Sequence, residues 1–216
     1  MKHLVIIGAR GFGREIFGMA HETDAYLNGE YDFKGFLDDA PHVLDGFPCP
    51  YGEYPPILGP VEDYEPQEND VFFCALGDAH VRRKYAQIIV SRGGRFINII
   101  LRNSRVSPAA KLGVGVFIGS GCAVSTNVSI GDFTIVHAYT VIGHDVTIGA
   151  ACTIEPFVFF GGWSKIGDEV TMHVRSSIVP RKCLGDDVVV GVASAVTRNF
   201  SKGLHIFGNP AKRLDF

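Results

Sequence analysis

Apolar residues recur at every sixth position through the second half of the chain. Counting in sixes from 106 to 196 meets sixteen positions, and all of them are apolar. At a background near one half, such a run has a chance probability on the order of one in 10⁵. The pattern therefore indicates a structural repeat, in the order Val106, Leu112, Ile118, Val124, Ile130, Val136, Ile142, Ile148, Ile154, Phe160, Ile166, Met172, Ile178, Leu184, Val190 and Val196.

Each hexad predicts one short strand followed by a corner. Glycine directly follows the apolar residue in nine hexads, and it tolerates the positive φ that we expect at a tight corner. The fourth residue after the apolar one is usually small or β-branched, as in Cys122, Thr134 and Thr140, which fits a second inward-facing layer. Three hexads complete a coil, and stacked coils share a continuous core. No hexad is interrupted, so we expect no long loop between 106 and 196.

The histidines are the residues that this repeat does not explain. Residues eighteen apart lie above one another in adjacent coils, so His144 has Gly162 as a vertical neighbour. On another corner, His137, Glu155 and His173 stack in three successive coils.

Three interpretations of these side chains remain open. They can be ordinary surface polarity at corners. The stack can bind a metal as in the γ-class carbonic anhydrases, although Ile178 stands where that family has a further histidine. Alternatively, His144 is a general base, because histidine side chains ordinarily titrate near pH 6.5 and accept a proton at physiological pH.

The first hundred residues follow a βαβ rhythm. Strands are predicted at 3–8, 32–39, 71–78 and 95–100, with helices at 14–22 and 79–91. We therefore expect a Rossmann-like domain over 1–100 and the repeat with its tail over 101–216. The turn G-A-R-G-F-G has Arg10 at the second glycine of the dinucleotide fingerprint. Its free amides suit a phosphate or a sugar, or the turn serves only strand-to-helix packing.

Composition excludes several classes of partner. The net charge of −3 argues against nucleic acids and anionic membranes, and no apolar run is long enough to span a membrane. Nothing beyond the turn supplies hydride chemistry. The odd number of cysteines, without a CxxC pair, is typical of a reducing cytoplasm and of core packing. They are Cys49, Cys74, Cys122, Cys152 and Cys183.

The repeat and the segment "GHDVTIG" at 143–149 resemble the PglD/NeuD-like sugar acyltransferases. This resemblance implies a left-handed parallel β-helix after the Rossmann-like domain. It also implies that His144 is the base that deprotonates the acceptor amine or hydroxyl, and that Asp145 orients its ring. Many members have a second histidine where this chain has Thr153, and asparagine where it has His137.

Three amino-terminal segments, "GARGFGRE", "GFLDD" and "ALGD", are similar to the same family, as is the tail "GNPAKRL". The resemblance implies a site for the nucleotide part of a nucleotide-linked sugar. The turn residues would lie along the phosphates or sugar, two aspartates near the base or ribose, and a Gly-Asp pair would close the pocket. These residues are Gly8, Ala9, Arg10, Gly11, Phe12, Asp38, Asp39, Gly77 and Asp78.

The expected function is that of a cytoplasmic enzyme in the synthesis of surface-glycan precursors. It would transfer acetyl from acetyl-CoA to an amine or hydroxyl of a nucleotide-linked sugar, without a metal in the site. The family forms homotrimers with acetyl-CoA between neighbouring helices, and the implied acetyl-CoA contacts are Thr153, Gly162, Val174, Gly191 and Lys212. The alternative is a trimeric binding or scaffold protein that lost the chemistry, motivated by Thr153.

Overall fold

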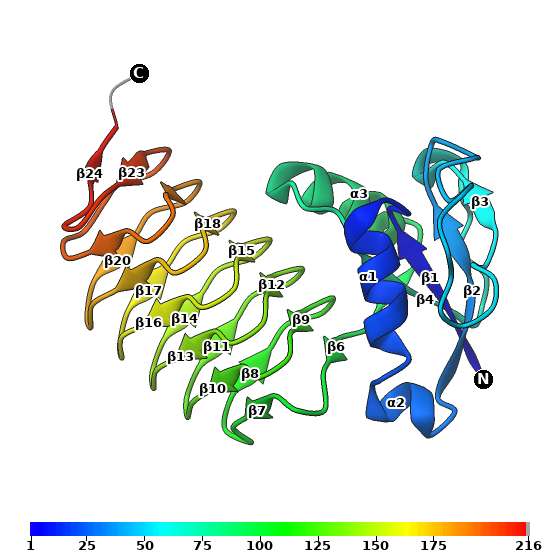
Figure 1. Ribbon diagram of the computed structural model, residues 1–216, viewed down its shortest axis with the longest axis horizontal. Helices are drawn as coiled ribbons and strands as arrows, with labels where there is room; N and C mark the ends of the chain where they lie inside the picture. The colour runs from blue at the N-terminus through cyan, green and yellow to red at the C-terminus, as the bar shows by residue number, and fades with distance from the viewer. Residues whose placement is uncertain (215–216) are drawn as a thin grey trace. The chain divides into compact units, whose positions relative to one another are not determined.

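The computed structural model describes residues 1–214 and divides into two compact units between Arg102 and Asn103 (Figure 1). The first unit is a layered α/β domain, and the second is a solenoid of short parallel strands. Within the described residues, no helix is both long and apolar enough to cross a membrane.

The first unit is built on a five-stranded parallel sheet in the order β3-β2-β1-β4-β5. The Rossmann-like prediction is therefore confirmed. Its strands are β1 Lys2–Ile7, β2 Tyr31–Leu37, β3 Ile57–Gly59, β4 Asp70–Cys74 and β5 Arg95–Phe96. Its helices are α1 Gly11–Ala20, α2 Asp24–Leu27, the 3-10 helix η1 Val61–Asp63 and α3 Ala79–Ser91.

Sequence pattern and local chemistry explain these elements. The run "LVII" of β1 is fully buried, as befits a central parallel strand covered on both faces. Helix α1 buries Ile16, Phe17 and Ala20 on one face. A Cβ on Gly13 would overlap the carbonyl of Gly8, so glycine permits the helix to leave β1 so closely.

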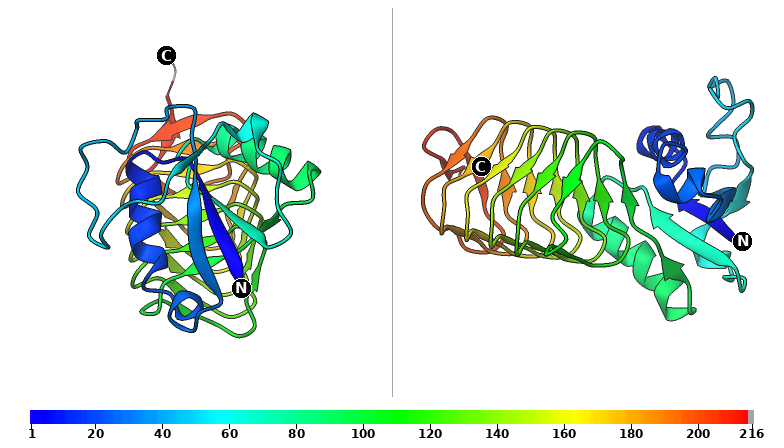
Figure 2. Two further views of the ribbon diagram at one scale, coloured as in Figure 1. Left: turned by 90° about the vertical axis from the view of Figure 1, so that its right-hand side faces the viewer. Right: turned by 90° about the horizontal axis from the view of Figure 1, so that it is seen from below.

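The strand order reverses between β1 and β4. The α1 crossover moves from β1 to β2, whereas the α3 crossover moves from β4 to β5 in the opposite direction. Because such crossovers are right-handed, the two helices lie on opposite faces of the sheet (Figure 2, left). A crevice opens outside the carboxyl ends of β1 and β4 at this reversal, which is where open α/β sheets bind ligands.

The second unit is the stack of short-stranded coils that the hexads predicted, a parallel β-helix whose left-handed sense the resemblance implied (Figure 2, right). Three parallel sheets form its sides. The first holds β7 Arg105–Val106, β10 Ala123–Val124, β13 Val141–Ile142, β16 Phe159–Phe160, β19 Ser177–Ile178 and β22 Ala195–Val196. The second holds β8 Lys111–Leu112, β11 Ser129–Ile130, β14 Thr147–Ile148, β17 Lys165–Ile166 and β20 Cys183–Leu184. The third begins with β6 Ile99–Ile100, the last strand before the boundary at Arg102, and continues with β9 Phe117–Ile118, β12 Ile135–Val136, β15 Thr153–Ile154, β18 Thr171–Met172, β21 Val189–Val190, β23 His205–Phe207 and β24 Lys212–Arg213.

Pairing among the strands from β7 to β22 follows the eighteen-residue spacing, whereas β21 pairs with β23 at a spacing of sixteen residues. Ile142 pairs with Val124 on one side and with Phe160 on the other, and every solenoid strand from β7 to β22 keeps this register. Fourteen of the sixteen hexad residues are buried, whereas Val106 and Leu112 of the first coil are half-buried. The second inward layer is confirmed as well, because Cys122, Thr134 and Thr140 are buried.

The corner glycines do not play the role expected for them. Positive φ occurs three positions after the apolar residue. At that position, twelve hexads have a residue other than glycine. The glycine directly after the apolar residue is instead needed for close approach between coils: a Cβ on Gly131 would lie 2.6 Å from the Ala150 nitrogen. The positive-φ residues are Asn127, Phe133, Tyr139, Asp145, Ala151, Phe157, Trp163, Glu169, Arg175, Arg181, Asp187 and Ala193.

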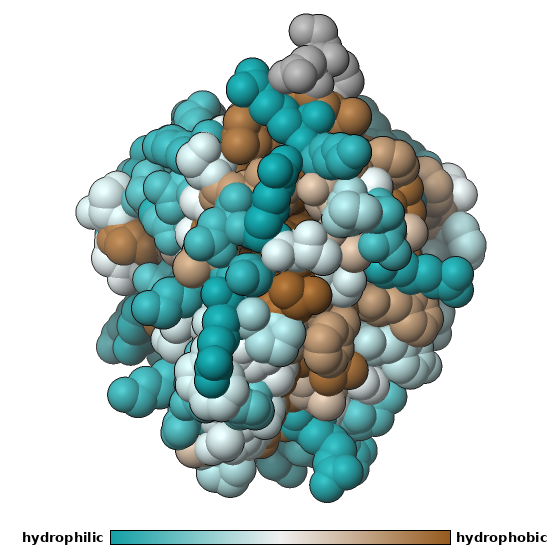
Figure 3. Space-filling model, turned by 90° about the vertical axis from the view of Figure 1, so that its left-hand side faces the viewer, coloured by the Kyte–Doolittle hydropathy of each residue, from teal (hydrophilic) through white to brown (hydrophobic). Residues whose placement is uncertain are grey.

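Other boundaries also differ from the prediction. The single strand expected at 95–100 is two strands, β5 and β6, because its two halves pair in different sheets. Helix α1 starts at Gly11, inside the expected glycine turn, and α2, β3 and η1 were not expected. The solenoid ends in the antiparallel pair β23 and β24, and hydrophilic side chains cover much of that end (Figure 3).

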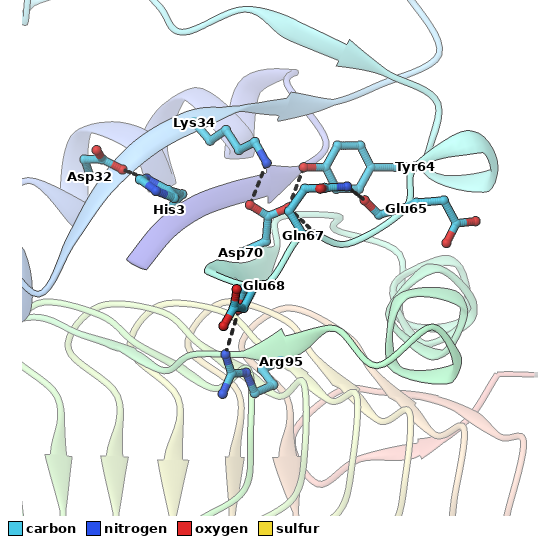
Figure 4. Close-up of polar contacts among 9 residues, drawn as sticks. All are labelled: His3, Asp32, Lys34, Tyr64, Glu65, Gln67, Glu68, Asp70 and Arg95. Atoms are coloured by element: carbon cyan, nitrogen blue, oxygen red, sulfur yellow. Dashed lines mark hydrogen bonds and ion pairs between the residues drawn. The ribbon is translucent and has the colours of Figure 1, made fainter. Parts of the chain in front are cut away.

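A polar network links β2 and β4, the two strands on either side of β1 (Figure 4). The Asp70 carboxylate, whose side chain is fully buried, accepts hydrogen bonds from Lys34 Nζ (2.6 Å), Tyr64 Oη (2.6 Å) and the Gln67 amide (2.9 Å). Burial alone would raise the pKa of Asp70, but these hydrogen bonds, led by the one from Lys34, lower it. The network joins β2 to the start of β4 and lies apart from the crevice residues described below.

Candidate active site

His144 stands on the solenoid corner between β13 and β14. Its Nδ1 atom lies 2.8 Å from Oδ2 of Asp145, the next residue in the chain. The carboxylate therefore holds the ring with Nδ1 as the donor, which leaves Nε2 as the basic nitrogen. Both side chains are partly exposed, 45% for His144 and 33% for Asp145. The sequence-predicted pair is thus assembled as a carboxylate–imidazole dyad open to solvent.

Asp145 is anchored from the neighbouring coil. Asn127 donates from Nδ2 to Oδ1 of Asp145 over 3.3 Å, and the Asp145 amide donates to the Thr126 carbonyl over 3.0 Å. The hydrogen bond from His144, and then the one from Asn127, hold the pKa of Asp145 below its ordinary value. The carboxylate is therefore ionised at neutral pH and can stabilise a positively charged imidazole beside it.

The coil on the other side shapes the space around the imidazole. A Cβ on Gly162 would lie 2.9 Å from both Cε1 and Nε2 of His144, so only glycine leaves room for the ring there. Trp163 packs against the same imidazole, with ring centroids 4.2 Å apart and planes at 89°. Chemically, the corner holds an oriented imidazole whose Nε2 is not bonded to the carboxylate, which is the arrangement that a general base requires.

A second carboxylate–imidazole pair lies on the corner between the third and first sheets. Glu155 accepts from Nδ1 of His173 (3.0 Å) and from the Val174 amide (2.8 Å). His137, one coil away, packs its ring near Phe117. In the described part of the chain, no three His, Cys, Asp or Glu side chains are placed to share a metal ion. The pair links two adjacent coils of the solenoid.

The expected acetyl-CoA contacts are spread over several coils. Thr153 is 92% buried on β15, Gly162 lies beside His144, and Lys212 is exposed on β24. The Val174 amide is already engaged by Glu155, and Gly191 packs against Phe207. The structure therefore brings Gly162 to the dyad and does not gather the five residues within one chain.

The first unit contains a pocket of about 430 Å³ at the reversal of strand order. Six of the nine residues expected at a nucleotide-sugar site line it: Gly8, Arg10, Phe12, Asp38, Asp39 and Gly77. They follow the carboxyl ends of β1, β2 and β4, as the topology requires. The remaining lining residues, which sequence reasoning did not name, are Ile7, Leu37, Val61, Ala75, Leu76, Val81 and Tyr85.

Three expected pocket residues have other placements. The Ala9 amide donates to Oδ2 of Asp38 (3.0 Å), so this residue fixes the carboxylate rather than lining the space. Asp78 caps α3 by accepting from the Val81 amide (2.9 Å). Gly11 begins α1 and is not part of the pocket wall.

Asn127 and Trp163 are the functional neighbours that sequence reasoning missed. The eighteen-residue spacing that pairs His144 with Gly162 also pairs Asp145 with Asn127 and with Trp163. The spacing in the sequence could therefore have identified both residues. By contrast, no sequence motif marks the apolar residues of the pocket lining, because any buried strand end supplies such residues.

Comparison with known proteins agrees with this geometry in both units. The PglD N-terminal domain family matches residues 3–89, and the bacterial transferase hexapeptide family (six repeats) matches residues 127–162. The first match lies within the α/β unit and the second within the solenoid. The resemblance to the PglD/NeuD-like sugar acyltransferases is therefore confirmed.

One curated relative matches this chain along nearly its whole length, and another matches over part of it. GDP-perosamine N-acetyltransferase of Escherichia coli O157:H7 is 28% identical over 97% of this chain and 95% of its own length. An uncharacterized protein of Acanthamoeba polyphaga mimivirus is 26% identical over 62% of this chain, which spans about a quarter (24%) of that protein's length.

Two solved structures superpose on nearly the whole chain. One is a histidine-to-asparagine mutant of perosamine N-acetyltransferase from Caulobacter crescentus, in complex with CoA and GDP-perosamine. It has a TM-score of 0.87 and 26% identity, and the match covers 100% of this chain and 98% of that one. The other is the acetyltransferase domain of PglB from Neisseria gonorrhoeae FA1090, with a TM-score of 0.87, 25% identity and coverage of 99% and 100%.

Proposed function

We propose that this protein transfers acetyl from acetyl-CoA to an amine or hydroxyl of a nucleotide-linked sugar, in the synthesis of surface-glycan precursors. The observation that carries the proposal is the His144–Asp145 dyad, held on an open corner with Nε2 unbonded to the carboxylate. The similarity to enzymes named as acetyltransferases of nucleotide-linked sugars supports the same activity.

The dyad fits direct acyl transfer. Nε2 of His144 takes the proton from the acceptor as its nitrogen or oxygen attacks the thioester carbonyl. A new bond to the acetyl carbon forms, the carbon–sulfur bond breaks, and the sulfur of CoA leaves as a thiolate that the imidazolium can protonate. Asp145 stabilises the imidazolium formed in between.

The pocket of the first unit fits the nucleotide part of the acceptor. The pocket lies at the amino terminus of α1, with Gly8, Arg10 and Phe12 in its wall, and a helix amino terminus favours anions such as phosphates. The carboxylates of Asp38 and Asp39 at the pocket wall are suited to accept hydrogen bonds from ribose hydroxyls or base amides. Gly77 also lines the pocket, and the next residue, Asp78, caps α3.

We also propose a homotrimer in the cytoplasm, with acetyl-CoA lying between neighbouring chains near Thr153, Gly162, Val174, Gly191 and Lys212. Two apolar side chains of the first solenoid sheet, Val141 and Phe159, are 42% and 48% exposed on paired strands, which favours burial against another copy. All five cysteines are free thiols, as expected in a reducing compartment.

The activity is tested with a panel of acceptors. Wild-type protein is incubated with acetyl-CoA and with UDP-, GDP- or CMP-linked amino sugars, and release of CoA is followed. We expect turnover with one nucleotide class and none with the free sugar. Absence of turnover across the panel would overturn the proposal.

Acetyl-CoA binding separates the enzyme from a scaffold that has lost its chemistry. A ligand at about 100 times its Kd stabilises the folded state by about 2.7 kcal/mol, so the melting temperature should rise with acetyl-CoA. An unchanged melting temperature at millimolar acetyl-CoA would favour the scaffold.

A further inference from the structure

Four consecutive coils contribute one column of side chains to the corner that carries His144. The column contains Asn127, Asp145, Trp163 and Arg181, each eighteen residues after the previous one and each at positive φ between 56° and 64°. Its members are in contact in order: Asn127 with Asp145, Asp145 through His144 with Trp163, and Trp163 with Arg181. The dyad is therefore part of a longer row of side chains that contact one another.

The imidazole of His144 is bounded on three sides. The Asp145 carboxylate holds Nδ1, the backbone at Gly162 lies against the ring edge, and the indole of Trp163 packs at a right angle to it. The indole is the largest of these groups, and its centroid lies 4.2 Å from that of the imidazole. Because an exposed histidine otherwise samples several staggered rotamers, this contact restricts the ring to the rotamer that reaches Asp145.

Trp163 is itself fixed although it is 46% exposed. Its amide donates to the His144 carbonyl over 3.0 Å, and the Arg181 guanidinium lies 5.0 Å from its ring centroid. The Arg181 amide donates in turn to the Gly162 carbonyl over 3.0 Å. The guanidinium covers the indole on the side of the next coil, within the range of a cation–π contact.

We propose that Trp163 is a positioning residue for the general base His144, and that Arg181 holds Trp163 in place. The inference rests on the proposed function, because it assigns a role at the same site. The indole acts on the rotamer of the imidazole and makes no bond to the reacting atoms. A base displaced by about 1 Å can lose up to about 10²-fold in rate, so the contact matters for turnover.

The neighbouring corner provides a matched control. There Phe157 is 50% exposed at φ 63°, stacks on Tyr139 at 5.2 Å, and has the Arg175 guanidinium 5.7 Å from its ring centroid. Phe157 thus resembles Trp163 in exposure, backbone conformation and a nearby guanidinium, but its aromatic partner is Tyr139 and not His144. Phe157→Ala removes an equally exposed aromatic ring from the same coil.

The direct test is a set of crystal structures of the wild-type protein, Trp163→Ala, Trp163→Phe and Phe157→Ala. We expect one His144 rotamer, with Nδ1 on Asp145, in the wild type, Trp163→Phe and Phe157→Ala. In Trp163→Ala the imidazole should occupy two or more rotamers. The same single rotamer in Trp163→Ala would overturn the inference whether or not the protein turns over any acceptor.

Kinetics with acetyl-CoA and GDP-perosamine as the probe acceptor give the second readout. Trp163→Ala should lower kcat about tenfold or more with both KM values within about twofold, and Trp163→Phe should restore most of kcat. Equal kcat for Trp163→Ala and the wild type would contradict the inference. A wild-type protein inactive on the whole acceptor panel would instead count against the proposed function, and the rotamer test would still decide the role of Trp163.

Discussion

His144 acquires its chemistry from neighbours that the repeat places at fixed positions. Asp145 follows it in the chain, whereas Gly162 and Trp163 reach it from the next coil. Backbone conformation contributes as well, because Asp145 adopts a φ of 60°, a region where aspartate is tolerated better than most residues. A plain structural repeat can therefore hold an oriented imidazole at a corner without any insertion in the coil.

Gly162→Ala tests this residue-scale account. The added Cβ would lie 2.9 Å from Cε1 and Nε2 of His144, so the imidazole has to move away from its place. We expect kcat to fall by about tenfold to a hundredfold. Steady-state kinetics in a double-mutant cycle provide the control. In a His144→Ala background, Gly162→Ala should lower kcat no further. A full additional loss in that background would show that Gly162 acts on something other than the imidazole.

At the scale of elements, the hexads predicted the solenoid strands almost residue by residue. The reason is that every sixth residue of a coil is both apolar in the sequence and buried in the structure. The N-terminal strands were predicted within one to four residues, and α3 at its true bounds, since Asp78 caps it. The break between β5 and β6 was not predictable, because "RFINII" is a continuous β-prone string and only the pairing partners separate its halves. The pocket walls followed from topology, but residues such as Val61 and Tyr85 come from elements without a motif.

Asp70→Asn tests how the polar network joins β2 and β4. Removing the buried charge weakens its hydrogen bonds to Lys34 and Tyr64, so the free energy of unfolding at pH 7 should fall by about 2 kcal/mol. Because the folded-state pKa of Asp70 is lowered, this stability is present above the unfolded pKa of about 3.9 and is lost as pH falls through the folded value.

Urea unfolding of both proteins across pH measures this effect. The difference between them should be constant near neutrality and shrink below about pH 4. Glu53→Gln, which removes an exposed carboxylate outside the network, is the control and should show little difference at any pH. A constant difference between wild type and Asp70→Asn down to pH 2 would contradict the role assigned to the ionised carboxylate.

At the scale of the whole molecule, the fold separates two tasks. The first unit presents a pocket at the carboxyl ends of its strands, and the second presents the His144–Asp145 dyad on a solenoid corner. The first and second solenoid sheets differ in their outward side chains: Val141 and Phe159 on the first are apolar, whereas Thr147 and Lys165 on the second are polar. This difference favours self-association through the first sheet.

Phe159→Glu tests the proposed trimer. A carboxylate placed in an apolar interface would be buried without a partner, at a cost of several kcal/mol per chain. Sedimentation of the wild type should give about 70 kDa, three times the 23.5 kDa chain, and Phe159→Glu should sediment as the single chain. Thr147→Glu on the second sheet is the control and should remain a trimer. A trimeric Phe159→Glu protein would place the interface elsewhere.

The measurement that tests the central claim most directly is acetyl transfer by His144→Ala beside His173→Ala. Both changes remove an imidazole held by a carboxylate, but only His144 is assigned as the base. With acetyl-CoA and the acceptor selected by the panel, kcat should fall about 10²-fold or more in His144→Ala and stay within about threefold in His173→Ala. Near-normal turnover by His144→Ala would contradict the account.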